Sequence, residues 1–241
     1  PMILAPKIDN VLIMGGGDAL ALRNVLRYPV KNVVLCEIDE AMLRMTRTIP
    51  EMVELSAGAL DDPRVEVLTQ DAAAYLENPP HLFDVVISDF PGSTKNELEA
   101  LFSHAFFLKM FRAMAPDGVT SVQISQKPGR YWDIFSNLAQ VFGWAVPLLA
   151  ELIPDQADEV KDLDPRPPDW ANYAVASTSE RMPCRPLADG VRYLSLQELP
   201  RLVIRNFNIE VFETENHPEG ITLMQYPATR AELEEQKRRA T

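Results

Sequence analysis

Short apolar runs alternate with amphipathic stretches over the first two-thirds of the chain. Seven runs have the length and aliphatic composition of buried strands, and they cover residues 11–14, 33–36, 65–68, 83–88, 119–124, 145–149 and 172–177. The stretches between them carry helical patterns, at residues 18–27, 37–48, 71–76, 97–114 and 132–141. Strands that alternate with helices in this way are typical of βαβ units around a parallel sheet. The pattern therefore predicts an α/β fold with a mostly parallel, seven-stranded sheet and helices on both faces.

The last third of the chain has a different composition. Residues 151–170 combine many acidic side chains with four prolines, and this composition predicts an acidic loop. Helical patterns return at residues 196–204 and 229–239. We expect one domain over residues 1–180, followed by a C-terminal extension over residues 181–241 that packs on this domain or trails from it.

The composition is that of a globular chain, and its charge narrows the choice of partners. Apolar residues make up 46% of the 241 residues, which argues against a disordered or collagen-like chain. The 35 acidic residues outnumber the 23 basic ones, so the net charge is −12, and an even surface of this sign repels nucleic acid. Small cationic molecules are favoured as partners.

Cysteine and histidine usage agrees with a reduced, metal-free protein. Cys36 and Cys184 lie far apart, and we expect no secretory leader, reduced thiols and a cytoplasmic location. The three histidines show no ligand spacing, and no metal site is expected. No apolar run approaches the roughly 18 residues of a membrane span. Neither a membrane nor a nucleic acid is therefore expected as a partner.

A glycine run directly after the first predicted strand is a candidate binding site. Gly15, Gly16 and Gly17 lead into a helical stretch, and glycine lets a ligand approach the backbone closely. The dinucleotide fingerprint needs a further glycine where Leu20 stands, and Asp18 places an anion where phosphates would bind. The run therefore indicates a nucleoside site; an enzyme linked to nicotinamide dinucleotides is a weak alternative, and a simple tight turn is another.

Three further acidic residues stand at the ends of predicted strands. Glu37, Asp71 and Asp89 close the second, third and fourth strands. Because the carboxyl ends of parallel strands open onto one crevice, we expect these side chains to meet Asp18 there. Four carboxylates around one cleft suit a neutral or cationic nucleoside, such as an adenosyl sulfonium. Taken alone, Asp71 fits a helix N-cap better than a ligand, and Asp39 is expected to be such a cap.

Several of these segments carry motifs that resemble one enzyme family. The motifs include Gly15-Gly16-Gly17-Asp18, Cys36-Glu37-Ile38-Asp39-Glu40, Gln70-Asp71-Ala72 and Asn172-Tyr173-Ala174-Val175-Ala176-Ser177. Together they resemble the spermidine synthases, which are polyamine aminopropyltransferases, over residues 10–178. The resemblance implies a class I methyltransferase-like Rossmann fold and a homodimer. It also implies transfer of an aminopropyl group from decarboxylated S-adenosylmethionine, a co-substrate, to a small cationic amine such as putrescine, with release of methylthioadenosine and no tightly bound cofactor.

The resemblance assigns a role to each candidate site residue. Gly15, Gly16, Gly17 and Asp18 would hold the aminopropyl and amine end of the co-substrate. Glu37, which is followed by Ile38, would bind the ribose hydroxyls. Asp71 and Ala72 would bind the adenine. Asp89 would be the catalytic base that opens the family's gate motif.

Two departures from the family pattern concern the residues that would bind the acceptor amine. The family's gate motif is Asp-x-x-Asp-Pro, whereas residues 89–93 place Gly92 where the second acid belongs. Family members also carry an N-terminal β-rich domain, and with only ten residues before the first strand we expect it to be absent from this chain. The acidic loop at residues 151–170 is a candidate anchor for the far ammonium group, with a solvated loop as the alternative. A methyltransferase that uses S-adenosylmethionine itself, and a catalytically altered nucleoside-binding homologue, are the alternative functions.

Overall fold

A single seven-stranded sheet organises the chain. The computed structural model describes residues 1–90, 96–124, 128–142, 144–149 and 172–179. The order across the sheet is β3-β2-β1-β4-β5-β7-β6. The strands are β1 (Asn10–Gly15), β2 (Asn32–Glu37), β3 (Val65–Thr69), β4 (Phe83–Asp89), β5 (Met114–Gln123), β6 (Trp144–Leu149) and β7 (Asn172–Ser177).

The sheet is mostly parallel, as predicted. Neighbouring strands from β3 through β2, β1 and β4 to β5 all pair in parallel. Only β7 runs the other way, and it pairs antiparallel with both β5 and β6. The central strand β1 is buried on both faces, with Val11 to Met14 at 0% exposure. This explains why its sequence is a continuous aliphatic run rather than an alternating one.

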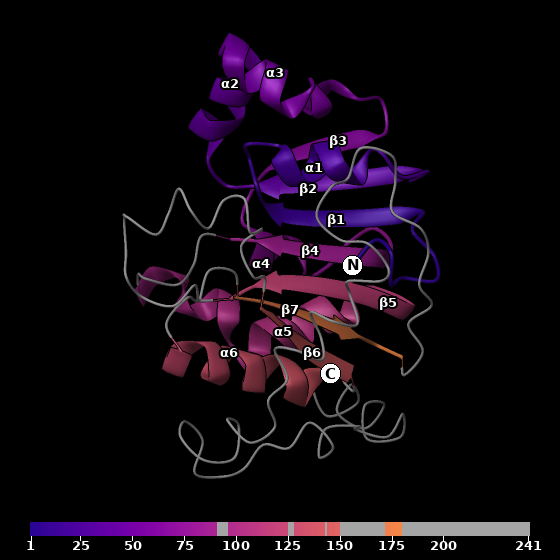
Figure 1. Cartoon of the computed structure of the whole chain (residues 1–241), viewed down its shortest axis with the longest axis vertical. Helices are drawn as coiled ribbons and strands as arrows, with labels where there is room; N and C mark the ends of the chain where they lie inside the picture. The colour runs from indigo at the N-terminus through magenta and orange to yellow at the C-terminus, as the bar shows by residue number, and fades with distance from the viewer. Residues whose placement is uncertain (91–95, 125–127, 143, 150–171, 180–241) are drawn as a thin grey trace, which may run out of the picture.

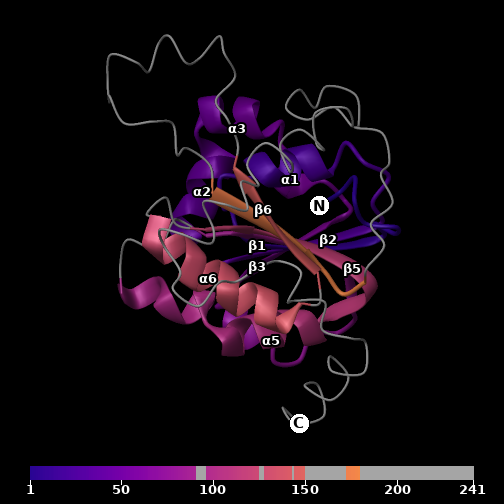
Figure 2. The same cartoon turned by 60° about the horizontal axis from the view of Figure 1, so that its bottom comes forward.

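Helices cover both faces of the sheet, and each face has its own core (Figure 1). The helices are α1 (Leu20–Val25), α2 (Glu40–Thr48), α3 (Pro50–Ser56), α4 (Ala72–Tyr75), α5 (His104–Arg112) and α6 (Pro128–Val141), with 3₁₀ helices η1 (Ala59–Asp61) and η2 (Asn96–Phe102). Aromatic side chains of α5 pack with α4 and α6 on one face. On the other face, α1, η1 and the N-terminal segment form the second core. Figure 2 shows the two helical layers on opposite sides of the sheet.

The prediction of a single helix over residues 97–114 is wrong, because the segment forms two helices and the start of a strand. The segment is a 3₁₀ helix, Asn96–Phe102, followed by a separate α-helix, His104–Arg112. Ser103 starts the second helix, because its Oγ accepts a hydrogen bond from the Phe106 N–H at 3.2 Å. The end of the expected helix belongs to β5, which begins at Met114. The predicted turn at Asp117 lies inside this strand as an irregularity, where Asp117 has a φ of +64°.

Pro50 ends one helix and also begins another. We expected it only to stop the helix over residues 37–48, and α2 does end at Thr48. The structure adds α3, Pro50–Ser56, with Pro50 in its first turn. A proline fits there because the first N–H groups of a helix have no intrahelical partner. This helix was not predicted.

Several expectations fall outside the residues that the structure describes. They are the acidic loop at 151–170, the helices at 196–204 and 229–239, the extension at 181–241, and the thiol of Cys184. Cys36 is buried and carries a free thiol. Among the helices of the described part, none has the length and apolar character needed to cross a membrane.

Candidate active site

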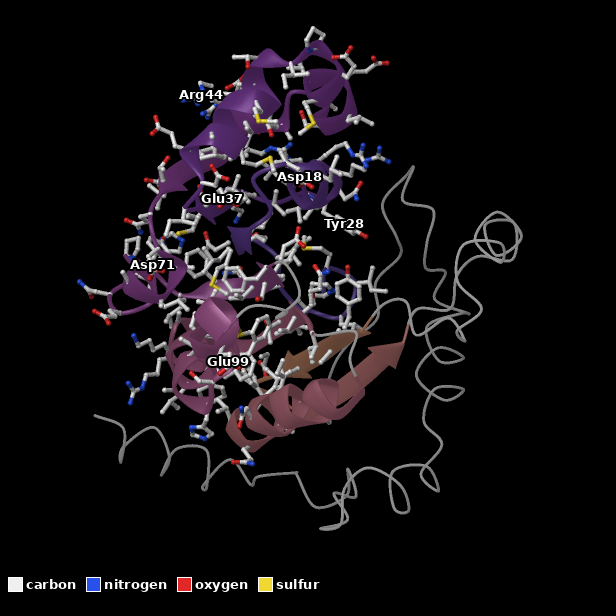
Figure 3. All side chains as sticks on the ribbon, turned by 90° about the vertical axis from the view of Figure 1, so that its left-hand side faces the viewer. Asp18, Tyr28, Glu37, Arg44, Asp71 and Glu99 are labelled. Atoms are coloured by element: carbon white, nitrogen blue, oxygen red, sulfur yellow. The ribbon has the colours of Figure 1, made fainter. Side chains whose placement is uncertain are left out.

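The parallel strands end at one side of the sheet, above a cavity of about 490 Å³. The nine residues proposed from the sequence all line this cavity: Gly15, Gly16, Gly17, Asp18, Glu37, Ile38, Asp71, Ala72 and Asp89. Figure 3 looks onto these strand ends, where Asp18, Glu37 and Asp71 follow one another in that order. The predicted crevice therefore exists, and the four predicted carboxylates line it together with Asp39. The role of each residue in it remains a prediction.

The glycine run makes room for the acidic side chains next to it. Gly15 and Gly16 have φ values of +77° and +69°, which residues other than glycine rarely adopt. A Cβ atom on Gly15 would lie 2.5 Å from the backbone oxygen of Asp89, and one on Gly16 would lie 2.8 Å from Oδ2 of Asp89. On Gly17 it would lie 2.8 Å from Cγ of Glu37. Glycine is thus needed here because the backbone of Asp89 and the side chains of Asp89 and Glu37 lie too close for any Cβ atom.

Glu37 is held in place by the backbone on both sides of its carboxylate. Its Oε2 accepts a hydrogen bond from the Gly17 N–H at 3.0 Å, and its Oε1 accepts one from the Asp39 N–H at 2.9 Å. These bonds join the end of β2 to the glycine run after β1. A carboxylate fixed in this way meets a ligand without first losing side-chain freedom.

We expect Glu37→Gln to lower the free energy of unfolding by about 1–2 kcal/mol, because the amide keeps one acceptor oxygen while its NH₂ faces the other backbone N–H and cannot accept that hydrogen bond. Urea denaturation of the ligand-free protein measures this change. The control is Glu54→Gln, a matched substitution at an exposed position of α3. Equal stability of the two variants would show that the hydrogen bonds to Glu37 do not support the fold.

Two of the acidic residues at the cavity also cap helices. Asp39 accepts hydrogen bonds from the N–H groups of Ala41 and Met42, so the expected N-cap of α2 is confirmed. Asp71 caps α4 by accepting from the Ala74 N–H at 2.8 Å, and it lines the cavity as well. The two interpretations of Asp71 are therefore compatible, because a carboxylate has more acceptor sites than the cap uses.

Asp89, like Asp18 and Glu37, is a half-buried carboxylate. It ends β4, beside Gly15 of β1 in the parallel register. Burial, followed by the negative charges of Asp18 and Glu37, raises the pKa of Asp89 above its ordinary value. A carboxylate whose pKa is raised is a stronger proton acceptor when it is ionised. This property suits a base that removes a proton from a cationic group.

The cavity has further lining residues that sequence reasoning missed. Met42, Phe90 and Leu101 supply an apolar part of the wall. They adjoin Ile38, which was proposed from the sequence and whose large apolar side chain, at 68% exposure, offers a surface on which a flat ring can pack. Gln123 lines the cavity at the end of β5. The strand-end rule that found the acidic residues also applies to Gln123, whereas no sequence signal marks the apolar residues.

Comparison with known families decides between the possible nucleoside-binding proteins. The model of the spermine/spermidine synthase domain matches residues 1–157. The chain belongs to the spermine/spermidine synthase family. The departure at Gly92 lies outside the described residues.

Curated relatives from several bacteria are named polyamine aminopropyltransferases. The chain is 45% identical over 142 residues to polyamine aminopropyltransferase 1 of Streptomyces coelicolor, a match that covers 57% of this chain and 27% of the relative. It is 40% identical over 142 residues to polyamine aminopropyltransferase 2 of Bacillus cereus, covering 56% of this chain and 39% of the relative. The chain thus spans less than half the length of either relative.

Solved structures of the family share the fold. The spermidine synthase from Thermotoga maritima superposes with a TM-score of 0.61 at 23% identity, covering 98% of this chain and 71% of that one. A spermidine synthase in complex with the transition-state analogue AdoDATO gives a TM-score of 0.60 at 22% identity, covering 98% and 70%. The methyltransferase-like fold implied by the motifs is therefore confirmed.

Proposed function

We propose that this chain binds decarboxylated S-adenosylmethionine and transfers its aminopropyl group to a small aliphatic amine such as putrescine, releasing methylthioadenosine. One observation carries the proposal: Asp18, Glu37, Asp71 and Asp89 line a single cavity at the strand ends. Family membership and the names of the curated relatives support the same reaction. The co-substrate is released as product after each turnover, so no tightly bound cofactor is part of the proposal.

The charge of the cavity suits a cationic nucleoside. The sulfonium and the terminal ammonium group of the co-substrate are both positive, and among the described residues every charged side chain that lines the cavity is acidic. Opposite charges a few ångströms apart attract strongly where water is partly excluded. In this proposal Glu37 binds the ribose hydroxyls, Asp71 and Ala72 bind the adenine, and the glycine run with Asp18 faces the aminopropyl end.

The transfer step is a displacement at carbon. The amine nitrogen of the acceptor attacks the methylene carbon bonded to the sulfonium, a C–N bond forms, and the C–S bond breaks. The bonding electron pair goes to sulfur, so methylthioadenosine leaves as a neutral thioether. The acceptor nitrogen must lose its ammonium proton before it attacks, and Asp89 accepts this proton and later passes it to solvent. Holding the nitrogen in line with the carbon supplies a further part of the rate enhancement.

The raised pKa of Asp89 favours this role. An alkylammonium group has a pKa of about 10.4, so at neutral pH nearly all of the acceptor is protonated. A carboxylate of ordinary pKa is a poor base for such a group. Burial raises the pKa of the carboxylate and so brings it closer to the pKa of the ammonium group. The nearby carboxylates of Asp18 and Glu37 also raise the pKa of Asp89.

The remaining parts of the proposal rest on the sequence pattern and on the family resemblance. They are a homodimer, a cytoplasmic location, a catalytic domain over residues 1–180 with an extension at 181–241, and the acidic segment 151–170 as an anchor for the far ammonium group of the acceptor. No nucleic acid partner is proposed, because the net charge of −12 opposes one. Sedimentation equilibrium tests the dimer.

Calorimetry with methylthioadenosine tests the nucleoside half of the proposal. We expect saturable binding at one site per chain. S-adenosylmethionine is the matched competitor, and it should bind more weakly than its decarboxylated form because its carboxylate meets the charge of Asp18. Absence of methylthioadenosine binding would refute the proposal, and tighter binding of S-adenosylmethionine would favour a methyltransferase instead.

A further inference from the structure

Thr46 is a buried polar residue of α2 that contacts the glycine run from outside the cavity. It is 2% exposed and does not line the cavity. A threonine hydroxyl in a helix commonly donates to the carbonyl four residues earlier, as Thr48 does to Arg44 at 2.8 Å. The Thr46 Oγ1 instead donates to the backbone oxygen of Gly17 at 2.7 Å, across 29 positions of the sequence. This hydroxyl therefore links α2 to the glycine run.

Gly17 is held by hydrogen bonds on both sides of its Cα atom. Its N–H donates to Oε2 of Glu37 at 3.0 Å, and its carbonyl oxygen accepts from Thr46. The two bonds fix different peptide units, because the N–H of a residue belongs to the unit before its Cα and the C=O belongs to the unit after it. A glycine turns freely about both bonds of its Cα. Thr46 thus fixes the peptide unit that joins Gly17 to Asp18.

The direction of the Asp18 side chain depends on this peptide unit. Asp18 lines the cavity, and its Oδ1 accepts a hydrogen bond from the Leu20 N–H at 3.0 Å. A carboxylate has more acceptor sites than this one bond uses, so Asp18 can also accept from a ligand. The attraction between a carboxylate and an ammonium group falls as the distance between them grows. A small rotation of the preceding peptide unit therefore changes how well Asp18 meets a cation.

We propose that Thr46 is a positioning residue for the co-substrate: acting through Gly17, its hydroxyl holds Asp18 in the direction that meets the terminal ammonium group of decarboxylated S-adenosylmethionine. The inference rests on the proposed function and adds to it a residue outside the cavity that determines selectivity for the aminopropyl end. Without the hydroxyl, the buried Gly17 oxygen lacks a donor, which is unfavourable enough to turn the peptide unit toward another one. Glu37 keeps both of its backbone hydrogen bonds, so the ribose end is not affected.

Calorimetry of Thr46→Val with two ligands, in the absence of an acceptor amine, tests this inference. Valine keeps the branched shape of threonine and removes the hydroxyl. We expect the affinity for decarboxylated S-adenosylmethionine to fall about tenfold. The affinity for methylthioadenosine should stay near the wild-type value, because this ligand has no ammonium group. A general structural defect would weaken both ligands alike. Thr46→Ser restores the hydroxyl and should recover wild-type affinity for both.

The control is Thr48→Val, the same substitution on α2 at an exposed threonine whose hydroxyl donates only to Arg44. It should bind both ligands as the wild type does. Wild-type affinity of Thr46→Val for decarboxylated S-adenosylmethionine would overturn the inference alone. An equal loss for both ligands, or a serine variant that recovers nothing, would do the same. A wild-type protein that binds no methylthioadenosine would overturn the proposed function together with it.

Discussion

Asp89→Asn is expected to lower the rate of aminopropyl transfer about a thousandfold, the usual contribution of a positioned general base. An amide cannot take the proton from the acceptor ammonium, but it has nearly the same shape as the carboxylate. The nucleoside should therefore still bind. Methylthioadenosine release from decarboxylated S-adenosylmethionine and putrescine measures the rate, and calorimetry measures the binding.

The same substitution should not weaken the fold of the ligand-free protein. Because the pKa of Asp89 is raised in the folded state, its stabilising contribution is fully present only below the ordinary aspartate value and is lost as the pH rises through the raised value. At neutral pH the ionised side chain thus destabilises the folded state. Asp89→Asn removes this destabilisation, so its midpoint of urea unfolding at neutral pH should equal or exceed that of the wild type.

The control for Asp89 is Asp117→Asn, the same chemical change at an exposed position outside the cavity. Asparagine also tolerates the left-handed backbone of Asp117, so this variant should keep both activity and stability. The transfer rate of the wild type should fall as the pH decreases through the raised pKa of Asp89. Full activity of Asp89→Asn would remove Asp89 from the mechanism.

The strands and the cavity could be predicted from the sequence because one physical rule determines both. A parallel strand buried on both faces contains a continuous apolar run, and its end is marked by the first charged residue after that run. Glu37 and Asp89 are such residues, and the pairing of β1 with β2 and β4 brings them to one edge. Family resemblance then supplied roles that spacing alone does not.

Other features depend on tertiary contacts that leave little trace in the sequence. Ser103 divides an apolar stretch of helical spacing into η2 and α5, yet a serine at such a position is also compatible with a continuous helix. The position of Tyr173 opposite Gln123 depends on the antiparallel insertion of β7 between β5 and β6. Strand order of this kind is decided by packing between distant segments, so Tyr173 could be recognised only as part of a late strand.

Gly15→Ala is expected to be the most damaging single methyl addition in the described part of the chain. The new Cβ would lie 2.5 Å from the backbone oxygen of Asp89, so β1 and β4 must separate where they line the cavity. The positive φ of Gly15 adds strain of about 1–2 kcal/mol for any residue with a Cβ. With the overpacking we expect a total loss of about 2–4 kcal/mol in the free energy of unfolding. A displaced Asp89 should also slow transfer about a hundredfold.

Gly58→Ala separates the backbone strain from the crowding. Gly58 has a similar φ of +65°, but a Cβ placed there would meet no atom within 4 Å. It should therefore lose only the strain, about 1 kcal/mol, and keep wild-type transfer and methylthioadenosine binding. Urea denaturation of both variants, with calorimetry on each, measures the difference. If the two alanine variants lose the same stability and both bind methylthioadenosine normally, the close approach of Gly15 to Asp89 does not shape the site.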